Sequence, residues 1–379
     1  MSDILSAIDL PRQLQTPQRI VVKVGSALLL RADGTLNAPW LTSLCADIAD
    51  LSAIGSKIIV VSSGAIGLGR GALNLVGRLR LEEKQAAAAA GQRLLMDAWQ
   101  TALSPHEITV AQILLTLGDT ENRRRYLNAR DTIETLIGLN AIAIINENDT
   151  TATDEIRYGD NDRLAAHVAQ MCSATMLIML SDVDGVYSAD PRHNAAAKHI
   201  PIVNTITKEI EDAAGGANSS RGTGSGGMAT KIAAAKIAVG AGCTAIVARG
   251  DVAHPLRTLK EGGLSTIFPP SLSPEKARRA WIAGRLSPRG TINIDAGAVT
   301  ALRDGSSLLA VGVIGVDGNF EKGDAVTIKG PDGKLVAQGL CAYDSRELIA
   351  VLGLKSTEID QTLGYRRAAV VHRNDMTLA

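Results

Sequence analysis

The chain has 379 residues, which is enough for two or three globular domains with cores of their own. The 39 Lys and Arg residues balance 39 Asp and Glu residues, which argues against a protein that holds nucleic acid or an anionic membrane by its overall charge. Aromatic residues make up 3%, too few for the stacking platforms of single-strand nucleic-acid binders, whereas 37 glycines and 46% hydrophobic residues suit an α/β enzyme.

The cysteine pattern and the absence of a membrane span or signal peptide in the sequence predict a location in the reducing cytoplasm. The four cysteines lie far apart and form neither a Cys-x-x-Cys pair nor a group with histidines, which argues against a disulfide framework and a zinc site. No apolar run approaches the roughly 18 residues of a membrane span. Residues 1–18 carry acids and prolines where a signal peptide needs a basic start and an apolar centre. We therefore expect a loose N-terminal extension and no membrane association.

Residues 19–248 alternate short β-branched runs with helical stretches, the pattern of an α/β fold with a mainly parallel open sheet covered by helices on both faces. The expected strands are almost entirely apolar, so both of their faces should be buried. They are Ile20–Val24, Ile58–Val61, Thr109–Leu115, Ala141–Ile145, Met176–Leu180 and Thr244–Ala248. The clearest expected helices are Pro39–Ile54, with a proline in its first turn, and Glu82–Leu103, which begins with acids as the helix dipole prefers.

The sequence changes character after about Arg249. A proline-rich stretch with one expected helix, Pro274–Ala283, leads into residues 290–352. These read as short strands divided by the turn pairs Asp304-Gly305, Asp317-Gly318 and Asp332-Gly333. The pattern predicts a small, mostly β second domain.

Polar residues and glycines directly follow several of the expected strands. In an open parallel sheet, ligands bind beyond the carboxyl ends of the strands. The segments that lie there are Val22–Ser26, Ser62–Ala65, Asn146–Asp149 and Ser181–Gly185. The sequence therefore predicts a polar ligand site along one edge of the sheet.

Lys23 is the most informative single residue. It lies inside the apolar run Ile20–Gly25, and an unpaired lysine is rarely buried. One reading is a strand-end lysine whose stem covers apolar surface while its ammonium stays in water. We favour a ligand role, because a compact cation fixed at a glycine turn can neutralise a phosphoryl group during its transfer.

A second lysine, Lys231, follows the glycine-rich segment Gly222–Gly227 and lies one turn inside an expected helix, Met228–Val239. Glycines let backbone amides approach phosphate oxygens at the positive end of a helix, and the lysine would add a cation there. The segment has the spacing Gly-x-Gly-x-x-Gly, but no strand precedes it, and it lacks the Gly-Lys-Ser/Thr of a Walker loop. A mobile Gly/Ser linker is the alternative, and a lysine at the helix start argues against it.

Amide and carboxylate side chains gather in Gly159–Asp162, immediately before the expected helix Leu164–Met171. One of them should cap that helix, and capping alone could explain the whole group. Together with Asn146–Asp149, the cluster offers acceptors for an α-ammonium group and amide donors for a carboxylate. Asp162 would hold either lysine side chains or a hydrated Mg²⁺. No histidine has the spacing of a metal site, and we assign none a catalytic role.

Taken together, these segments resemble a known family. They are similar to the amino acid kinase family, and specifically to the glutamate 5-kinases, in Val22–Ser26, Val61–Ile66, Asn146–Asp149, Gly159–Asp162, Ser181–Tyr187 and Gly226–Lys231. The likeness implies an amino acid kinase domain over residues 19–270. Residues 286–365 resemble a PUA domain, which accompanies glutamate 5-kinases within this fold.

The resemblance implies ATP-dependent, Mg²⁺-requiring phosphorylation of the side-chain carboxylate of L-glutamate to L-glutamyl 5-phosphate, the first step of proline biosynthesis. It implies that Lys23 and Lys231 hold the transferring phosphoryl group and that Asp162 organises both lysines. It places glutamate against Ser63, Asp149 and Asn161, and it leaves the ligands of Mg²⁺ unassigned. The implied ATP-binding residues are Lys23, Ser181, Asp182, Ser225, Gly226, Gly227, Met228, Ala229, Thr230 and Lys231.

The resemblance also implies partners. It suggests proline as a feedback inhibitor, a homo-oligomeric state, and delivery of the unstable product to the next enzyme of the proline pathway. For the PUA-like domain it raises RNA binding, but residues 274–379 carry 14 basic and 12 acidic residues, which is too small an excess for an electrostatic footprint.

Two enzymatic alternatives stay open. One is a kinase of the same fold that acts on another carboxylate or a nucleotide. The other is an NAD-dependent dehydrogenase on a Rossmann-like sheet, because the glycine-rich run Gly67–Ala72 closely follows an expected strand. The acids at about the right distance, Glu82 and Glu83, begin a helix where that fold would require them to end a second strand.

Overall fold

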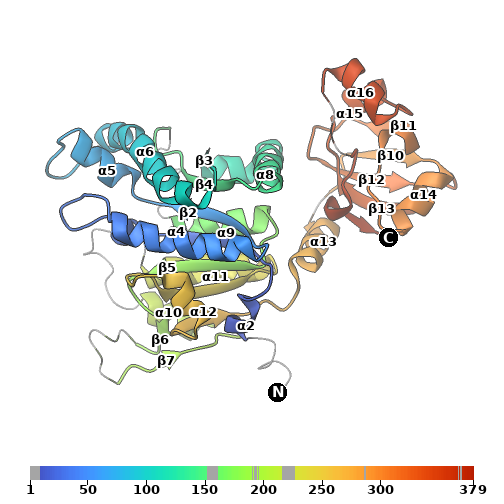
Figure 1. Ribbon diagram of the computed structural model, residues 1–379. Coiled ribbons are helices and arrows are strands. Elements are labelled where there is room, and N and C mark those ends of the chain that lie inside the picture. Colours follow the sequence, from blue (N-terminus) through green and yellow to red (C-terminus); the bar gives the residue numbers. More distant parts are fainter. Residues whose placement is uncertain are drawn as a thin grey trace. The chain divides into compact units, whose positions relative to one another are not determined.

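The computed structural model describes residues 9–151, 161–189, 191, 194, 196–215, 227–285, 287–365, 367 and 369–379. The chain forms two compact units. The first comprises Met1–Glu121 and Ala129–Pro274, and the second comprises Asn122–Asn128 and Glu275–Ala379. Figure 1 shows both units, with helices and strands labelled where there is room.

A seven-stranded sheet forms the centre of the first unit, in the order β3-β4-β2-β1-β5-β8-β9. All neighbouring strands are parallel except β9, which pairs antiparallel with β8. The strands are β1 (Arg19–Val24), β2 (Lys57–Ser62), β3 (Val110–Leu115), β4 (Ile142–Glu147), β5 (Met176–Ser181), β8 (Thr244–Arg249) and β9 (Ser265–Phe268). The six strands expected from the sequence are all present, which confirms the mainly parallel α/β sheet. The short β9 was not expected.

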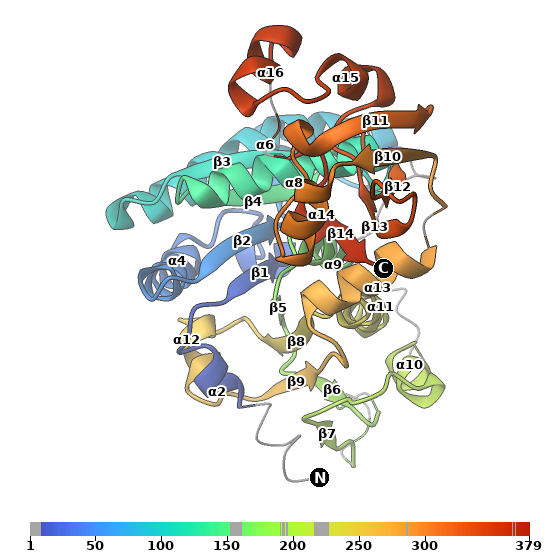
Figure 2. The same cartoon turned by 90° about the vertical axis from the view of Figure 1, so that its right-hand side faces the viewer.

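Helices cover both faces of this sheet. One face carries α4 (Ala38–Ala53), α6 (Leu81–Leu103) and α12 (Pro255–Lys260), and the other carries α9 (Asn161–Met171) and α11 (Met228–Gly240). In Figure 2, α4 and α12 lie on one side of the strands and α9 and α11 on the other. Side chains alternate between the faces along each strand. Ile20, Val22 and Val24 of β1 therefore pack toward α4, and Lys23 faces α9.

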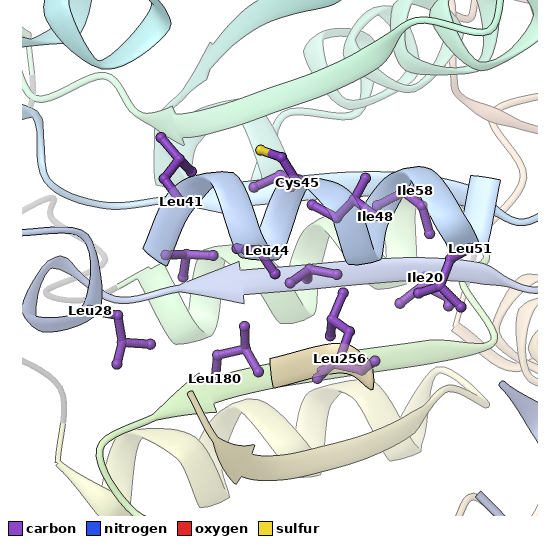
Figure 3. Close-up of a cluster of buried hydrophobic side chains, with 14 of the residues drawn as sticks. Ile20, Leu28, Leu41, Leu44, Cys45, Ile48, Leu51, Ile58, Leu180 and Leu256 are labelled. Atoms are coloured by element: carbon purple, nitrogen blue, oxygen red, sulfur yellow. The ribbon is translucent and has the colours of Figure 1, made fainter. Parts of the chain in front are cut away.

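The packing of α4 shows how the main core forms. Leu41, Leu44 and Ile48 recur at helical spacing along one side of the helix and are almost completely buried. Figure 3 labels them along α4, in the same apolar cluster as Ile20 of β1 and Leu180 of β5. This apolar stripe holds the helix against the sheet and fixes the strands whose ends carry the polar residues.

The smaller elements of this part of the chain are α2 (Leu10–Gln13), α3 (Ser26–Leu29), α5 (Ala65–Ala72), η1 (Ser104–His106), α7 (Leu117–Glu121), α8 (Arg123–Gly138) and α10 (Lys208–Gly215), with the hairpin β6 (Val186–Tyr187) and β7 (His199–Ile200). The expectation of a loose extension over residues 1–18 is wrong for α2 and its flank. Leu10 and Leu14 are buried in the main core, because they supply an apolar pair that the helix turns inward. Among the described helices, none has the length and apolar character of a membrane span.

The second unit has its own five-stranded sheet, in the order β11-β10-β12-β13-β14. The strands are β10 (Gly290–Ile294), β11 (Val313–Gly318), β12 (Ala325–Lys329), β13 (Leu335–Leu340) and β14 (Met376–Leu378). Its helices are α13 (Pro274–Arg285), α14 (Ala296–Arg303), α15 (Ser345–Ala350) and α16 (Ser356–Leu363), and short 3₁₀ turns lie at η2 (Ala310–Gly312) and η3 (Arg373–Asp375). Ile292, Val326 and Tyr343 are central members of a separate apolar core.

The second unit contains more helix than its turn pairs suggested. Asp332-Gly333 does join two strands, β12 and β13, whereas Asp304-Gly305 ends the helix α14. The side chain of Asp295 accepts a hydrogen bond from the backbone N–H of Ala298 and so caps the start of α14. The mostly β character of the domain is confirmed by its five-stranded sheet, but the segment at α14 is a helix where a strand was expected, because the prediction gave no weight to this cap.

The glycine-rich run that suggested a dinucleotide loop lies inside the helix α5. A Cβ on Gly69 would lie 1.7 Å from the carbonyl oxygen of Ala87, and a Cβ on Gly91 would lie 1.8 Å from that of Ala65. The two glycines therefore let α5 and α6 touch through their backbones. The run has a packing role, and the dehydrogenase alternative loses the motif on which it depended.

This close contact predicts opposite effects for two glycines of one helix. Gly69→Ala should lower the free energy of unfolding by about 1 to 3 kcal/mol, because the new methyl group meets backbone atoms that cannot rotate away. Gly71→Ala is the control, since a Cβ there meets nothing within 4 Å. Alanine should raise helix propensity at that position and stabilise by up to about 1 kcal/mol. Chemical unfolding of both variants measures the difference, and equal stabilities would contradict the backbone contact.

Candidate active site

The carboxylate of Asp162 joins two buried lysines. The Nζ of Lys23 on β1 lies 2.6 Å from Asp162 Oδ1, and the Nζ of Lys231 on α11 lies 3.1 Å from Oδ2. Asp162 is 0% exposed, and each lysine is 5% exposed. The sequence had left two partners open for Asp162, lysines or Mg²⁺, and both of its oxygens face ammonium groups.

The charge state of this cluster follows from its surroundings. Burial alone would raise the pKa of Asp162, but the ammonium groups of Lys23 and Lys231 outweigh burial and hold that pKa below its ordinary value of 3.8. Asp162 is therefore a carboxylate at neutral pH. Two cations against one anion leave this three-residue cluster with an excess positive charge, which suits an anionic ligand.

The start of α11 is tied to the same carboxylate. The hydroxyl of Thr230 lies 3.0 Å from Asp162 Oδ2 and 2.8 Å from the carbonyl oxygen of Gly227, and it can donate to either. Met228 and Ala229 lie beside it in the first turn of this helix. The expected phosphate-binding residues Ser225 and Gly226 fall outside the described residues, as does most of the glycine-rich segment before the helix.

A chain of amide side chains lies at the ends of β2 and β4. The Nδ2 of Asn161 lies 2.8 Å from Ser63 Oγ, 2.9 Å from Asn146 Oδ1 and 3.2 Å from the carbonyl oxygen of Ser62. Asn146 in turn donates through its Nδ2 to Gln92 Oε1, at 2.9 Å. The expected substrate residues Ser63 and Asn161 are thus in direct contact.

This arrangement changes one part of the expectation for Asn161. The sequence suggested that the amides of this cluster would donate to a substrate carboxylate. The amino group of Asn161 has two protons and already faces three acceptors within the protein, so its donors are committed internally.

The sequence did not single out Gln92 as a site residue, and Asn146 appeared only as part of a motif. Gln92 is 8% exposed and lies on the buried side of α6, two turns before Trp99, whose indole N–H donates to Ser62 Oγ at 3.1 Å. A glutamine in the middle of an otherwise Ala- and Leu-rich helix face is the signal that could have identified it.

The remaining expected residues lie along the same edge. Asp149 is half-buried and follows the end of β4 by two positions. Ser181 ends β5 and donates through its hydroxyl to Asp182 Oδ1 at 3.1 Å, and the side chain of Asp182 is exposed. Because the strand order is β4-β2-β1-β5, Lys23 lies between an amide-lined half and a half formed by β5 and α11.

Comparisons with known proteins agree with this geometry. The chain matches the model of the amino acid kinase family over residues 18–249. The chain belongs to the amino acid kinase family. Its residues 290–363 match the PUA domain, which confirms the second expected resemblance.

Relatives of this amino acid kinase carry a common name. The chain is 54% identical over 367 residues to a glutamate 5-kinase of Caulobacter vibrioides (strain NA1000 / CB15N), covering 96% of this chain and 97% of that protein. It is 52% identical to a glutamate 5-kinase of Paramagnetospirillum magneticum, with 96% and 99% covered. It is 54% identical to glutamate 5-kinase 1 of Rhizobium meliloti, with 97% and 93% covered. The likeness therefore extends through both units.

The buried ion cluster predicts how the stability of this kinase depends on pH. Asp162→Asn should lower the free energy of unfolding by about 3 to 5 kcal/mol at pH 7, because two buried ammonium groups lose their counter-ion. The pKa of Asp162 is depressed in the folded state, so its contribution is complete above the unfolded value near 3.8 and is lost as the pH falls below it. The difference in free energy of unfolding between the wild-type protein and Asp162→Asn should therefore become smaller below about pH 4.

Chemical unfolding at pH 7 and at steps between about pH 5 and 3 measures this gap. Asp97→Asn is the control, since Asp97 forms an exposed pair with Arg93 on α6 and should change stability little. A gap that stays constant down to pH 3 would show that the charge of Asp162 does not stabilise the fold.

Proposed function

We propose that this protein transfers the γ-phosphoryl group of ATP to the side-chain carboxylate of L-glutamate and forms L-glutamyl 5-phosphate. The observation that carries the proposal is the buried Lys23–Asp162–Lys231 cluster at the carboxyl edge of the sheet. The names of its near-full-length relatives indicate glutamate as the acceptor. The reaction would open proline biosynthesis in the cytoplasm.

The acceptor in this reaction needs no base. A side-chain carboxylate with a pKa of about 4.3 is already ionised at neutral pH and can attack directly. What the enzyme must overcome is the repulsion between this anion and the phosphates of ATP. Lys23 and Lys231 supply the positive charge, and Asp162 keeps both ammonium groups in place before the substrates arrive.

The two sides of the cluster are assigned to the two substrates. Ser63, Asp149 and Asn161 would contact glutamate, because they lie at the ends of β2 and β4 and at the start of α9. The ATP side would be formed by Ser181, Asp182 and residues 225–231, at the end of β5 and the start of α11. Lys23, on the strand between the two halves, would reach the phosphoryl group in transit.

Mg²⁺ enters this proposal as a companion of ATP. Within the described part of the chain, no group of three or more His, Cys, Asp or Glu side chains could hold a metal ion. Asp162 is not a candidate ligand, because both of its oxygens face ammonium groups. When bound, Mg²⁺ neutralises phosphate charge, and we assign it no protein ligand.

The regulatory and assembly partners follow from the same family. Proline shares with glutamate a cationic α-nitrogen and an α-carboxylate, so it can compete for the polar groups that hold the amino-acid end. We propose proline as a feedback inhibitor and a homo-oligomer as the working form. The acyl phosphate product is sensitive to water, which favours direct delivery to the next enzyme of the pathway.

The reaction can be tested directly with the full chain. ADP release should be measured with L-glutamate, L-aspartate and other acidic amino acids, together with ATP and Mg²⁺, in the presence of hydroxylamine. Hydroxylamine converts an acyl phosphate into a hydroxamate, and we expect hydroxamate with glutamate above all other acids. Absence of hydroxamate with glutamate would reject the proposed function.

The catalytic lysines can be tested by their kinetic signature. Lys23→Ala and Lys231→Ala should each lower kcat by about 100-fold or more, with a much smaller rise in the KM for glutamate, because their charge matters most as the phosphoryl group transfers. Lys236→Ala is the control on the same helix, where Lys236 forms an exposed pair with Glu211. A variant with normal kcat and only weaker glutamate binding would remove that lysine from the catalytic group.

A further inference from the structure

Backbone groups fix the orientation of Asn146. The backbone N–H of Glu147 donates to Asn146 Oδ1 at 2.9 Å, and an N–H group can only donate. The oxygen of the Asn146 amide must therefore lie on that side and its nitrogen on the other. The nitrogen faces Gln92 Oε1 at 2.9 Å, so Gln92 supplies the acceptor that this buried amide requires.

A backbone group also fixes Asn161. The carbonyl oxygen of Ser62 can only accept, and it lies 3.2 Å from Asn161 Nδ2. Reversing the amide of Asn161 would set its oxygen against this carbonyl and against Asn146 Oδ1. The side chain therefore keeps its nitrogen inward, and within the described residues no group donates to its Oδ1. The Oδ1 of Asn161 is therefore the atom available to a ligand, and it can only accept a hydrogen bond.

We propose that Gln92 is a positioning residue for substrate selection. Through Asn146 it reinforces the orientation that the carbonyl of Ser62 gives Asn161, in which Oδ1 is presented to the α-ammonium group of glutamate. This inference rests on the proposed function, because it takes Asn161 as a contact to glutamate. The amide chain would thereby select substrates that carry a cation on the α-carbon.

The side-chain amide of Gln92 is buried at an unfavourable free energy, which supports a role beyond packing. Its Nε2 is buried and has no hydrogen-bond partner among the residues that the structure describes. An unpaired buried amide group is unfavourable, and an apolar residue of the same size would avoid it. Gln92 also lies on a firmly held part of α6, between the backbone contact at Gly91 and the indole of Trp99 bonded to Ser62. Because Gln92 is held in place, its Oε1 is a well-positioned acceptor for the Nδ2 of Asn146.

The test compares two substrates that differ only in the α-ammonium group. Glutarate has the same two carboxylates as glutamate and lacks that group. The kcat/KM for each is measured by hydroxamate formation with ATP and Mg²⁺, and the ratio of glutamate to glutarate reports on ammonium recognition. In Gln92→Met, which keeps the volume and loses the acceptor, this ratio should fall about tenfold, with the KM for ATP unchanged.

Three further variants make the result specific. Gln92→Glu keeps an acceptor oxygen and should retain most of the ratio. Gln92→Asn is one methylene too short for the contact and should lower the ratio as Gln92→Met does, so it replaces Gln92→Met if the latter does not fold. Gln100→Met is the control on the same helix, because Gln100 also accepts a hydrogen bond, from the backbone N–H of Val110, but is exposed. That variant should leave the ratio unchanged.

The outcomes separate this inference from the proposed function. If wild-type protein forms no hydroxamate with glutamate, the proposed function fails first. If it does, and Gln92→Met lowers kcat/KM for both substrates equally, Gln92 has a structural role only and the inference is wrong. An unchanged ratio in a folded Gln92→Met protein, or a wild-type protein that does not prefer glutamate to glutarate, would also overturn it.

Discussion

The first unit depends on one arrangement of charge, the Asp162 carboxylate between the ammonium groups of Lys23 and Lys231. Buried ions are unfavourable unless each has a partner, so both lysines depend on Asp162, and Asp162 depends on at least one of them. The three residues come from β1, α9 and α11, and their attraction holds a strand and two helices together at the sheet edge. The ion cluster that would bind phosphate therefore also stabilises the fold.

Strand order explains why two chemically different halves meet at this group. The amide side chains lie near the ends of β2 and β4, the hydroxyl and glycine residues lie at the end of β5 and before α11, and β1 lies between the two groups. The alternation of side chains along β1 then decides which face receives the lysine. Ile20, Val22 and Val24 enter the apolar core under α4, and the lysine faces the helices that carry Asp162 and Lys231.

Much of this could be predicted from the sequence. Apolar runs located six strands of the sheet, and Lys23 was conspicuous as a charge inside one of them. Contacts that depend on the third dimension were not predictable: nothing in the sequence pairs Gln92 with Asn146, because one lies on a helix and the other at the end of a distant strand. Gly69 misled for the same reason, since a glycine required by a neighbouring backbone looks identical to one required by a phosphate. The cap at Asp295 shows that local signals can also be overlooked.

The contact between α5 and α6 has a mechanical consequence. Ser63 is followed two residues later by Ala65, whose carbonyl meets Gly91, and Gly91 is the neighbour of Gln92. From Gln92 the hydrogen bonds run through Asn146 and Asn161 back to Ser63. These residues form a ring that is joined by covalent bonds along the chain, by hydrogen bonds between the amide side chains, and by the steric contact between Ala65 and Gly91. Because the links close on themselves, a shift of any one of these residues is opposed by its neighbours on both sides. The amino-acid end of the site is therefore preorganised before a ligand binds.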